Sequence, residues 1–445
     1  MMWLKIAAIS LAVVLIVRFE WLRLNKGSAR ERAALIAVAA IGWISALLLV
    51  IFPRLPGPLM LIDWLYRPLA GFNRRMRCRL MAEKGKITAG QLAFLIYSLL
   101  AYDGLLLIPK VTGEAAGRDL WLSPVWAHLA GLFFLLAMFR LGRMFPEETI
   151  IEYSQRLLGK YLGKAAGLVV VFYLAYLTSV ILRIYGDFIS SVFLEITPPL
   201  VSAGGIMVLI SYTVRAGVET LGRLAQLFLP ITVLVFALLV VLTIPEWDVS
   251  NVFPILGNGL APSLKGAVVP FSWFGAYIVL GLYLPLLSNR RKAALYGLAA
   301  WFLLMVTLVV SGLVAVFLFG QHAISLNYPF VEVVRYIAVG EFFQHIDALL
   351  LAVWLPGTFI QLAIYQYGAT LGMAQWIGLK DYRALALPLG FLILVMSFWT
   401  PPSNIDFERY MAGSHIFLDF TFFVFGLLLF LTAWIRSKFG AQKAK

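Results

Sequence analysis

Apolar stretches of about 20 residues recur along the whole chain, and they restrict its fold more than any other feature. A helix of about 20 apolar residues crosses a bilayer, where every backbone polar group must be satisfied internally. The stretches are continuous, whereas the strands of a membrane β-barrel alternate between apolar and polar residues. With 62% hydrophobic and 13% charged residues, the sequence predicts an all-α polytopic membrane protein embedded in the lipid bilayer.

The apolar stretches divide the chain into three parts. An N-terminal extension, residues 1–85, holds two hydrophobic segments and a basic cytoplasmic loop. Residues 86–436 are expected to form a ten-helix, transporter-like core, and residues 437–445 a basic cytoplasmic tail. The expected membrane segments are 3–19, 33–52, 88–108, 121–139, 165–194, 200–213, 222–243, 267–287, 293–319, 343–372, 384–399 and 414–436.

Lys and Arg residues concentrate in alternate connections of the core, which predicts that these connections and both ends of the core are cytoplasmic. The net charge of +14 is therefore a topology signal and does not indicate nucleic-acid binding. The connection 18–32 does not fit, because it is basic and would lie outside if both N-terminal segments cross. Either the stronger Lys and Arg bias of the core connections overrides the charge of this connection, or the first segment lies in the membrane interface.

Asp103 is a carboxylate inside the apolar segment 88–108. A carboxylate at bilayer depth costs roughly 2.5–3.5 kcal/mol, so it is a functional hypothesis by default. Tyr102 offers a ring and a hydroxyl to a solute, and Gly104 lowers helix propensity where the chain would open. The sequence therefore predicts that Tyr102, Asp103 and Gly104 bind a ligand; a carboxylate satisfied by local amides is the structural alternative.

A second apolar segment, 267–287, is interrupted by Pro270 and Gly275. Two interrupted segments at corresponding positions of two halves indicate a solute site in transporters. Taken alone, this interruption fits an ordinary proline kink equally well. We assign a ligand-binding role to four residues here, namely Phe271, Ser272, Trp273 and Gly275.

Arg183 and Asp187 stand four residues apart, on one face of the segment 165–194. This spacing predicts either a structural ion pair or a gate. The four His residues are scattered, so no metal site is predicted, and no catalytic motif indicates an enzyme. We expect no cofactor, although H⁺ or Na⁺ could act as a coupling ion at Asp103.

From about Lys86 to residue 436 the chain resembles the spore-germination receptor B-subunit family, within the amino-acid/polyamine/organocation transporter superfamily. The resemblance rests on several stretches taken together: Lys86–Leu92, Leu141–Pro146, the pattern Tyr212-Thr213-Val214-Arg215-Ala216-Gly217-Val218-Glu219, and the outer loop from Tyr328 to Leu349. It implies two inverted five-helix repeats (LeuT-like) with discontinuous first and sixth core helices, preceded by two N-terminal hydrophobic segments. The chain departs from the family at Asp103, where a small neutral residue is usual, and at Ala276, where an acid is usual.

The resemblance further implies the membrane subunit of a spore germinant receptor in the spore inner membrane. Such a subunit binds a small nutrient, here expected to be an amino acid, and works with A-type and lipoprotein C-type subunits to signal germination. An amino-acid permease coupled to H⁺ or Na⁺ is the alternative, and a scaffold whose pocket has lost its function is a third. The sequence leaves the ligand, the choice between transport and sensing, and the oligomeric state open.

Overall fold

The computed structural model describes residues 2–23, 29–51, 85–336, 347–399, 407 and 410–442, and nearly all of this part is helical. The described residues contain no named strand, and Ile87 and Leu287 form an isolated parallel bridge. The chain divides into two compact units that interleave along the sequence. Unit 1 comprises residues 1–85, 147–220 and 362–411, and unit 2 comprises 86–146, 221–361 and 412–445. The predicted boundaries after residues 85 and 436 stay predictions, and most of the basic loop that precedes the core lies outside the described residues.

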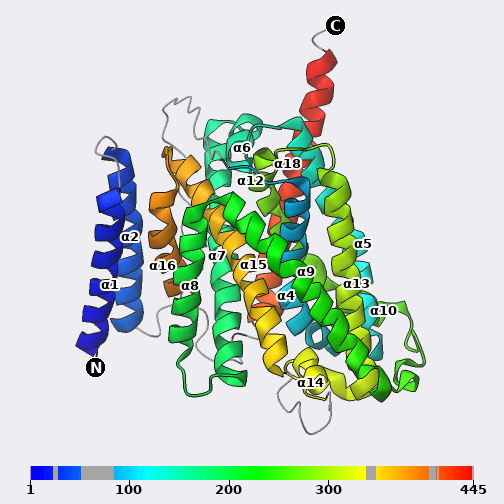
Figure 1. The fold of residues 1–445 in the computed structure, drawn as a ribbon. Helices are drawn as coiled ribbons and strands as arrows, with labels where there is room; N and C mark the ends of the chain where they lie inside the picture. The colour runs from blue at the N-terminus through cyan, green and yellow to red at the C-terminus, as the bar shows by residue number, and fades with distance from the viewer. Residues whose placement is uncertain are drawn as a thin grey trace. The chain divides into compact units, whose positions relative to one another are not determined.

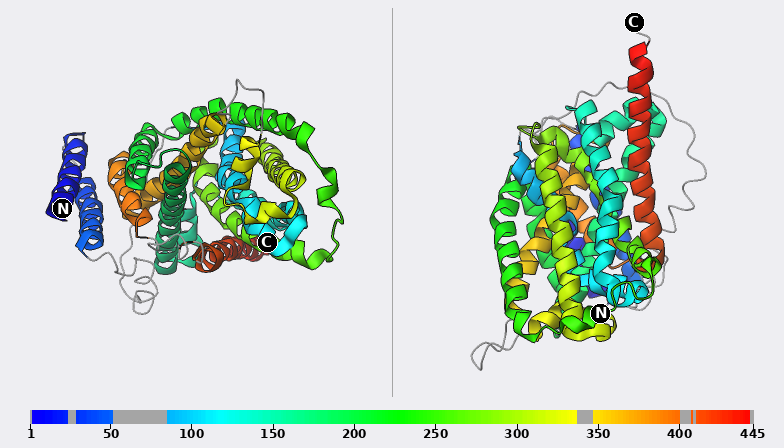
Figure 2. Two further views of the ribbon diagram at one scale, coloured as in Figure 1. Left: turned by 90° about the horizontal axis from the view of Figure 1, so that it is seen from below. Right: turned by 90° about the vertical axis from the view of Figure 1, so that its right-hand side faces the viewer.

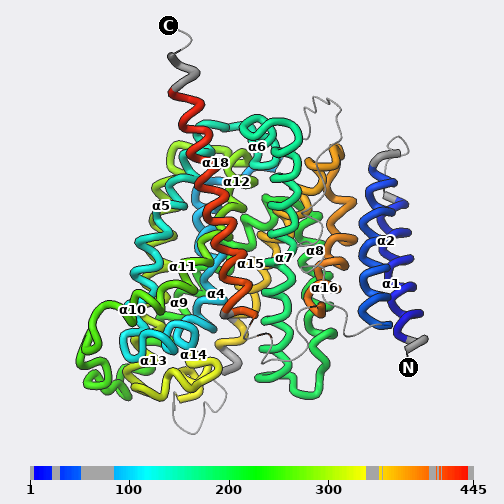
Figure 3. The backbone as a smooth tube through the Cα atoms, turned by 180° about the vertical axis from the view of Figure 1, so that it is seen from behind, coloured from blue at the N-terminus to red at the C-terminus, as the bar shows by residue number. Residues whose placement is uncertain are grey.

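Unit 2 contains the first, second, fifth, sixth, seventh and tenth helices of the core and the first half of the eighth. α13 lies alongside α4, and α18 lies alongside α5 (Figures 2 and 3). Its elements are α4 (Ala89–Ala116), η1 (Gly117–Leu122), α5 (Ser123–Met144), α9 (Val218–Thr243, which begins in unit 1), η2 (Ile244–Glu246), η3 (Val249–Val252), α10 (Leu260–Gly266), α11 (Val268–Ser272), η4 (Trp273–Val279), α12 (Leu280–Tyr283), η5 (Leu284–Leu286), α13 (Ala293–Phe319), η6 (Gly320–Ser325), α14 (Pro329–Arg335), the first half of α15 (Asp347–Ile377), a π-helical turn (Met411–His415) and α18 (Ile416–Gln442).

Unit 1 groups the N-terminal helices with the third, fourth and ninth core helices and the second half of the eighth. α1 and α2 lie side by side, and both pack against α16 (Figure 1). Its elements are α1 (Met2–Arg23), α2 (Ala29–Ile51), α6 (Ile150–Leu158), α7 (Lys160–Val192), α8 (Pro199–Ala216), the second half of α15, η7 (Arg383–Leu385) and α16 (Ala386–Ser397).

Nine helical stretches of the described residues are long and apolar enough to cross a membrane, which confirms a multi-pass membrane protein. Ala89–Met144 takes in two of the predicted segments, and Arg383–Ser397 is a shorter apolar helix at the predicted segment 384–399. The nine stretches are Glu31–Ile51, Ala89–Met144, Lys160–Val192, Pro199–Ala216, Val218–Glu246, Val268–Leu286, Ala293–Ser325, Leu350–Ile377 and Gly413–Lys438.

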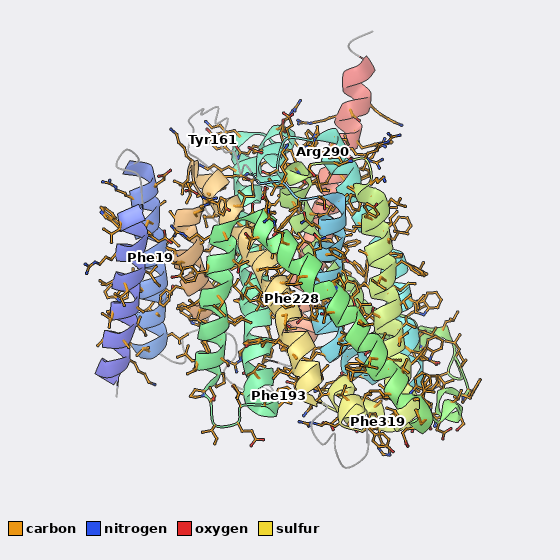
Figure 4. All side chains as sticks on the ribbon, viewed as in Figure 1. Phe19, Tyr161, Phe193, Phe228, Arg290 and Phe319 are labelled. Carbon is orange, nitrogen blue, oxygen red and sulfur yellow. The ribbon has the colours of Figure 1, made fainter. Side chains whose placement is uncertain are left out.

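The exposed face of α9 is apolar, as expected for a helix in contact with lipid. Leu227, Ile231, Leu234, Leu238 and Val241 recur every three or four residues and are 47–70% exposed. This spacing places them on one face of the helix, as an apolar stripe. In Figure 4 the labelled Phe228 marks α9. An exposed apolar stripe on so long a helix is the pattern expected where the solvent is lipid.

Local signals in the sequence set several helix ends. Thr88 accepts a hydrogen bond from the Gln91 amide, and the Gln91 side chain accepts one from the Thr88 amide, so a capping box starts α4. A second capping box starts α6, where the Thr149 amide donates to Glu152 Oε2 at 2.8 Å. Burial raises the pKa of the Glu152 carboxyl, while its bonds with Thr149 act in the opposite direction.

Candidate functional site

Asp103 is joined to a residue far away in the sequence. It stands on α4, and its Oδ2 accepts a hydrogen bond of 2.6 Å from Gln361 Nε2 on α15. The same nitrogen donates to the carbonyl of Leu99, one turn before Asp103, at 3.0 Å. All three residues belong to unit 2. Two bonds from one amide therefore hold α15 against α4 at the depth of the carboxylate.

These bonds fix the orientation of the Gln361 side chain. A reversed amide would bring its oxygen against the Asp103 carboxylate and the Leu99 carbonyl, which are both acceptors. Gln361 Oε1 must therefore point away from them, and it has no hydrogen-bond partner among the described residues. The same holds for Asp103 Oδ1 and for Thr358 Oγ1, three residues before Gln361 on α15. The site thus presents unpaired oxygens, and two of these three are pure acceptors.

A set of oxygens of this kind selects its ligand by charge. Carboxylate and amide oxygens are suited to an ammonium group, to Na⁺ or to a proton, and they repel an anion. Burial makes the unsatisfied state costly, because each unpaired buried group forfeits its hydration. The arrangement can therefore bind a cationic group of a solute or a monovalent cation.

Tyr102 is held beside Asp103 by the same helix. The Trp354 indole Nε1 donates to the Tyr102 carbonyl at 3.1 Å, and the Tyr102 ring packs on the backbone of α15 at Gly357. A Cβ at Gly357 would stand 1.8 Å from Tyr102 Cε1, closer than any real contact. Gly357 is thus required for α4 and α15 to approach each other here.

Trp354 and Gln361 were not predicted from the sequence, although their spacing along the segment indicates a shared helix face. Together with Gly357 and Thr358, they occupy positions i, i+3, i+4 and i+7, which make up one helix face. A fully buried Gln on that face has to find polar partners. The sequence shows this face, but it does not show that the face meets Asp103.

The structure corrects one prediction about α4. The helix continues unbroken from Ala89 to Ala116, so the opening expected at Gly104 does not occur. Gly104 instead gives room to Leu308 of α13, whose Cδ2 would lie 2.6 Å from a Cβ at that position. Close packing between α4 and α13 therefore explains this glycine.

The second predicted break is present. The sixth core helix is divided into α10, α11, η4 and α12. Gly275 lies against α18, since a Cβ there would stand 2.2 Å from the carbonyl oxygen of Asp419. Phe271 packs its ring on Phe420 and Phe423 of α18, with centroids 5.1 and 4.8 Å away. The break is thus packed against α18.

The other predicted residues of this segment are buried. Ser272 donates to the Val269 carbonyl of its own helix at 2.7 Å, and Trp273 is 8% exposed. α4 packs against both α11 and η4, so the two predicted segments are neighbours within unit 2. Among the described residues, however, no hydrogen bond joins Ser272 to Asp103. The ligand-binding roles of Phe271, Ser272, Trp273 and Gly275 stay predictions.

Arg183 and Asp187 form the expected pair within α7 of unit 1. Arg183 Nε lies 2.6 Å from Asp187 Oδ2, and the two side chains are 13% and 22% exposed. This geometry satisfies both charges locally. A role of the pair as a gate stays a prediction. Groups of three or more His, Cys, Asp or Glu side chains suited to a metal do not occur among the described residues.

The helices define a helical membrane protein with a transporter-like fold, and solved structures with this fold agree. The crystal structure of MhsT in complex with L-phenylalanine matches with a TM-score of 0.56 and 16% identity, over 78% of this chain and 88% of MhsT. Mhp1, a nucleobase-cation-symport-1 family transporter, matches with a TM-score of 0.53 and 10% identity, over 76% of this chain and 78% of that one. The predicted fold of two inverted five-helix repeats is confirmed.

The family model described as spore germination protein matches residues 86–405, and the chain belongs to this family. Spore germination protein KB of Bacillus subtilis (strain 168) is 27% identical over 372 residues, which cover 80% of this chain and 96% of that protein. Spore germination protein YndE of the same organism is 24% identical over 369 residues, covering 80% and 98%. The resemblance inferred from the sequence is thereby confirmed, and α1 and α2 lie outside the matched range.

Proposed function

We propose that this chain is the membrane subunit of a spore nutrient receptor and binds an amino acid at Asp103. The observation that carries the proposal is the Asp103–Gln361 pair with its unpaired oxygens, in a chain of the spore germination protein family. The α-ammonium group of the ligand meets Asp103 Oδ1, Gln361 Oε1 and Thr358 Oγ1. Tyr102, which contacts Trp354 and Gly357, directly precedes Asp103 on α4.

Binding acts by shifting a conformational equilibrium. A ligand favours a conformation only by the difference between its affinities for the two states. Here the difference arises at the contact between α4 and α15, because the ammonium group bridges oxygens from both helices. We propose that this change is passed to A-type and lipoprotein C-type subunits. The likeness to MhsT, whose structure holds L-phenylalanine, supports an amino acid as the ligand class.

The proposal is tested by ligand-dependent stabilisation of the purified full-length chain. The proteinogenic L-amino acids are added one at a time, and thermal unfolding of the protein is measured in detergent or nanodiscs. We expect at least one of them to raise the unfolding temperature, and Asp103→Asn to abolish that rise. Asp248→Asn, at an exposed loop acid that bonds Ser250, serves as the matched control and retains it. An unchanged rise in Asp103→Asn contradicts the assignment of the site.

Copurification tests the assembly. The tagged chain, expressed in a spore-forming host, is expected to bring down an A-type and a lipoprotein C-type subunit. Recovery of the chain without either one contradicts the receptor role and leaves the binding site to be judged by the thermal assay alone.

A coupled permease is the second candidate, and the same oxygens favour it. Asp103 Oδ1 and Gln361 Oε1 suit Na⁺ or a transferable proton as well as an ammonium group. Uptake of a labelled amino acid into proteoliposomes of the purified chain distinguishes the two. Uptake driven by a Na⁺ or pH gradient supports the permease, whereas stabilisation without uptake supports the receptor.

A further inference from the structure

α4 satisfies its own backbone amides at the depth of Asp103. The helix is continuous from Ala89 to Ala116, so each N–H there donates to the carbonyl four residues earlier. Its one proline, Pro109, has no N–H, so it removes a donor and adds none. In transporters with discontinuous helices, the N-termini of half-helices point at anionic groups of the substrate, such as a carboxylate. The unbroken α4 lacks such a group beside Asp103.

The divided sixth core helix also keeps amides at its junctions bonded. The Ala267 amide, where α10 passes into α11, donates to the Leu264 carbonyl at 3.2 Å. The Leu280 amide, where η4 passes into α12, donates to the Tyr277 carbonyl. Both junctions pass from one helical turn directly into the next. Unlike the N-terminus of a half-helix, they present no free amide to the carboxylate of a ligand.

Basic side chains are also scarce around Asp103, which forms no salt bridge with a described residue. The only Lys or Arg of α4 is Lys110, about 10.5 Å further along the helix axis, and its Nζ donates to Asn327 Oδ1 at 3.2 Å. α11, η4, α12, α13 and α15 contain no Lys or Arg, and α5 carries Arg140 and Arg143 among its last five residues. A carboxylate brought beside Asp103 would therefore meet a like charge, which is unfavourable in a medium of low dielectric constant.

We infer that the Asp103 site selects its ligand by net charge and binds a primary amine of net charge +1, without recognising a carboxylate. The unpaired oxygens Asp103 Oδ1, Gln361 Oε1 and Thr358 Oγ1 match the N–H donors of one primary ammonium group. This ligand class rests on the proposed function, because it presupposes an ammonium group at Asp103. It comprises amino acids with a second cationic group and amino acids whose carboxyl group is blocked as an amide.

A zwitterionic amino acid fits this site less well than a cation of the same shape. Its ammonium group can make the same hydrogen bonds to the three oxygens. Its carboxylate, however, leaves water without a donor to receive it, and burying a charge in this way is costly. The charge of Asp103 also stays uncompensated, because the ligand brings no net charge. A carboxamide in place of the carboxylate removes both costs.

Matched ligands test this charge selection on the purified full-length chain in nanodiscs. Each proteinogenic L-amino acid is compared with its carboxamide, and L-lysine with L-norleucine, which lacks the second ammonium group. We expect the more cationic member of a pair to raise the unfolding temperature at a concentration lower by about tenfold or more. Tetramethylammonium chloride, a cation without N–H groups, is the control for unspecific ionic effects and is expected to give no rise.

Two variants separate charge from hydrogen bonding. Asp103→Asn removes the charge that the ligand has to balance, so the preference for the carboxamide is expected to disappear. Thr358→Val removes one acceptor and leaves the charge unchanged. It is expected to weaken both members of a pair by the same factor and to keep their ratio. A ratio that is unchanged in Asp103→Asn overturns the assignment of charge selection to this carboxylate.

The outcomes distinguish this ligand class from the proposed function. Equal effects of an amino acid and its carboxamide, both lost in Asp103→Asn, overturn the charge selection and leave the proposed site intact. If the two are equal in Na⁺ buffer and differ in K⁺ buffer, a bound Na⁺ supplies the charge, which also overturns it. A rise that persists undiminished in Asp103→Asn contradicts the site itself. No rise with any amino acid or carboxamide contradicts both.

Discussion

The side-chain amide of Gln361 bridges the Asp103 carboxylate and the Leu99 carbonyl, which are separated by one turn of α4. This relationship explains how a carboxylate is retained in a membrane helix. It receives a charge-assisted hydrogen bond from a neighbouring helix, and such bonds are about twice as strong as neutral ones. Its other oxygen, Oδ1, has no hydrogen-bond partner among the described residues.

Gln361→Met is expected to lower the apparent affinity for the stabilising amino acid by about tenfold or more. Met has a similar length but cannot bond Asp103 or Leu99, and hydrogen bonds to charged groups contribute about 1.5–3 kcal/mol. Ligand-dependent thermal unfolding measures the change. Gln366→Met, on the same helix but in unit 1, is the control that leaves the ligand response intact. Equal responses of wild type and Gln361→Met contradict the prediction.

Gly357→Ala is expected to destabilise the protein by about 1–3 kcal/mol, because a new Cβ collides with the Tyr102 ring and forces α4 and α15 apart. The unfolding temperature of the purified chain checks this. Gly205→Ala is the control, since no atom lies within 4 Å of a Cβ at that position. Similar unfolding temperatures for the two variants rule out the close contact.

Gly275→Ala tests the packing of the sixth helix on α18. Its Cβ meets the backbone carbonyl of Asp419, which cannot rotate away as a side chain can. We expect lower stability and loss of the ligand response together. Gly104→Ala is expected to be milder, because Leu308 can change its rotamer. A Gly275→Ala variant as stable as Gly104→Ala contradicts this ranking.

Glu152 gives a pH dependence with a defined sign. Burial raises the pKa of this carboxyl in the folded protein above its usual 4.5. A raised pKa favours the protonated form, so its contribution to stability is present at low pH and is lost as pH rises through the folded value. Glu152→Gln keeps the capping partner but cannot ionise. From pH 4 to pH 7 the variant should therefore gain stability relative to wild type, measured by thermal unfolding; a constant difference contradicts the prediction.

The membrane class, the positions of most helices and the break in the sixth core helix follow from the sequence. Continuous apolar stretches permit one kind of structure in a bilayer, and Pro270 and Gly275 weaken a helix wherever it packs. Arg183 and Asp187 were also predictable as a pair, because a helix brings residues four positions apart together.

Gly104 shows where local reasoning failed. A glycine in a helix fits either a local break in that helix or a close contact with a neighbouring helix. Only the position of Leu308 on α13 decides between the two.

At Asp103 it is clearest what the sequence determines and what the tertiary structure determines. The sequence by itself determined that a carboxylate lies in an apolar helix and needs a partner, since the energetic cost depends only on the residue and its segment. Tertiary structure alone decided that the partner is Gln361. That residue is 258 positions away, and the rotation of α15 that turns it toward α4 is set by packing at Gly357 and Trp354.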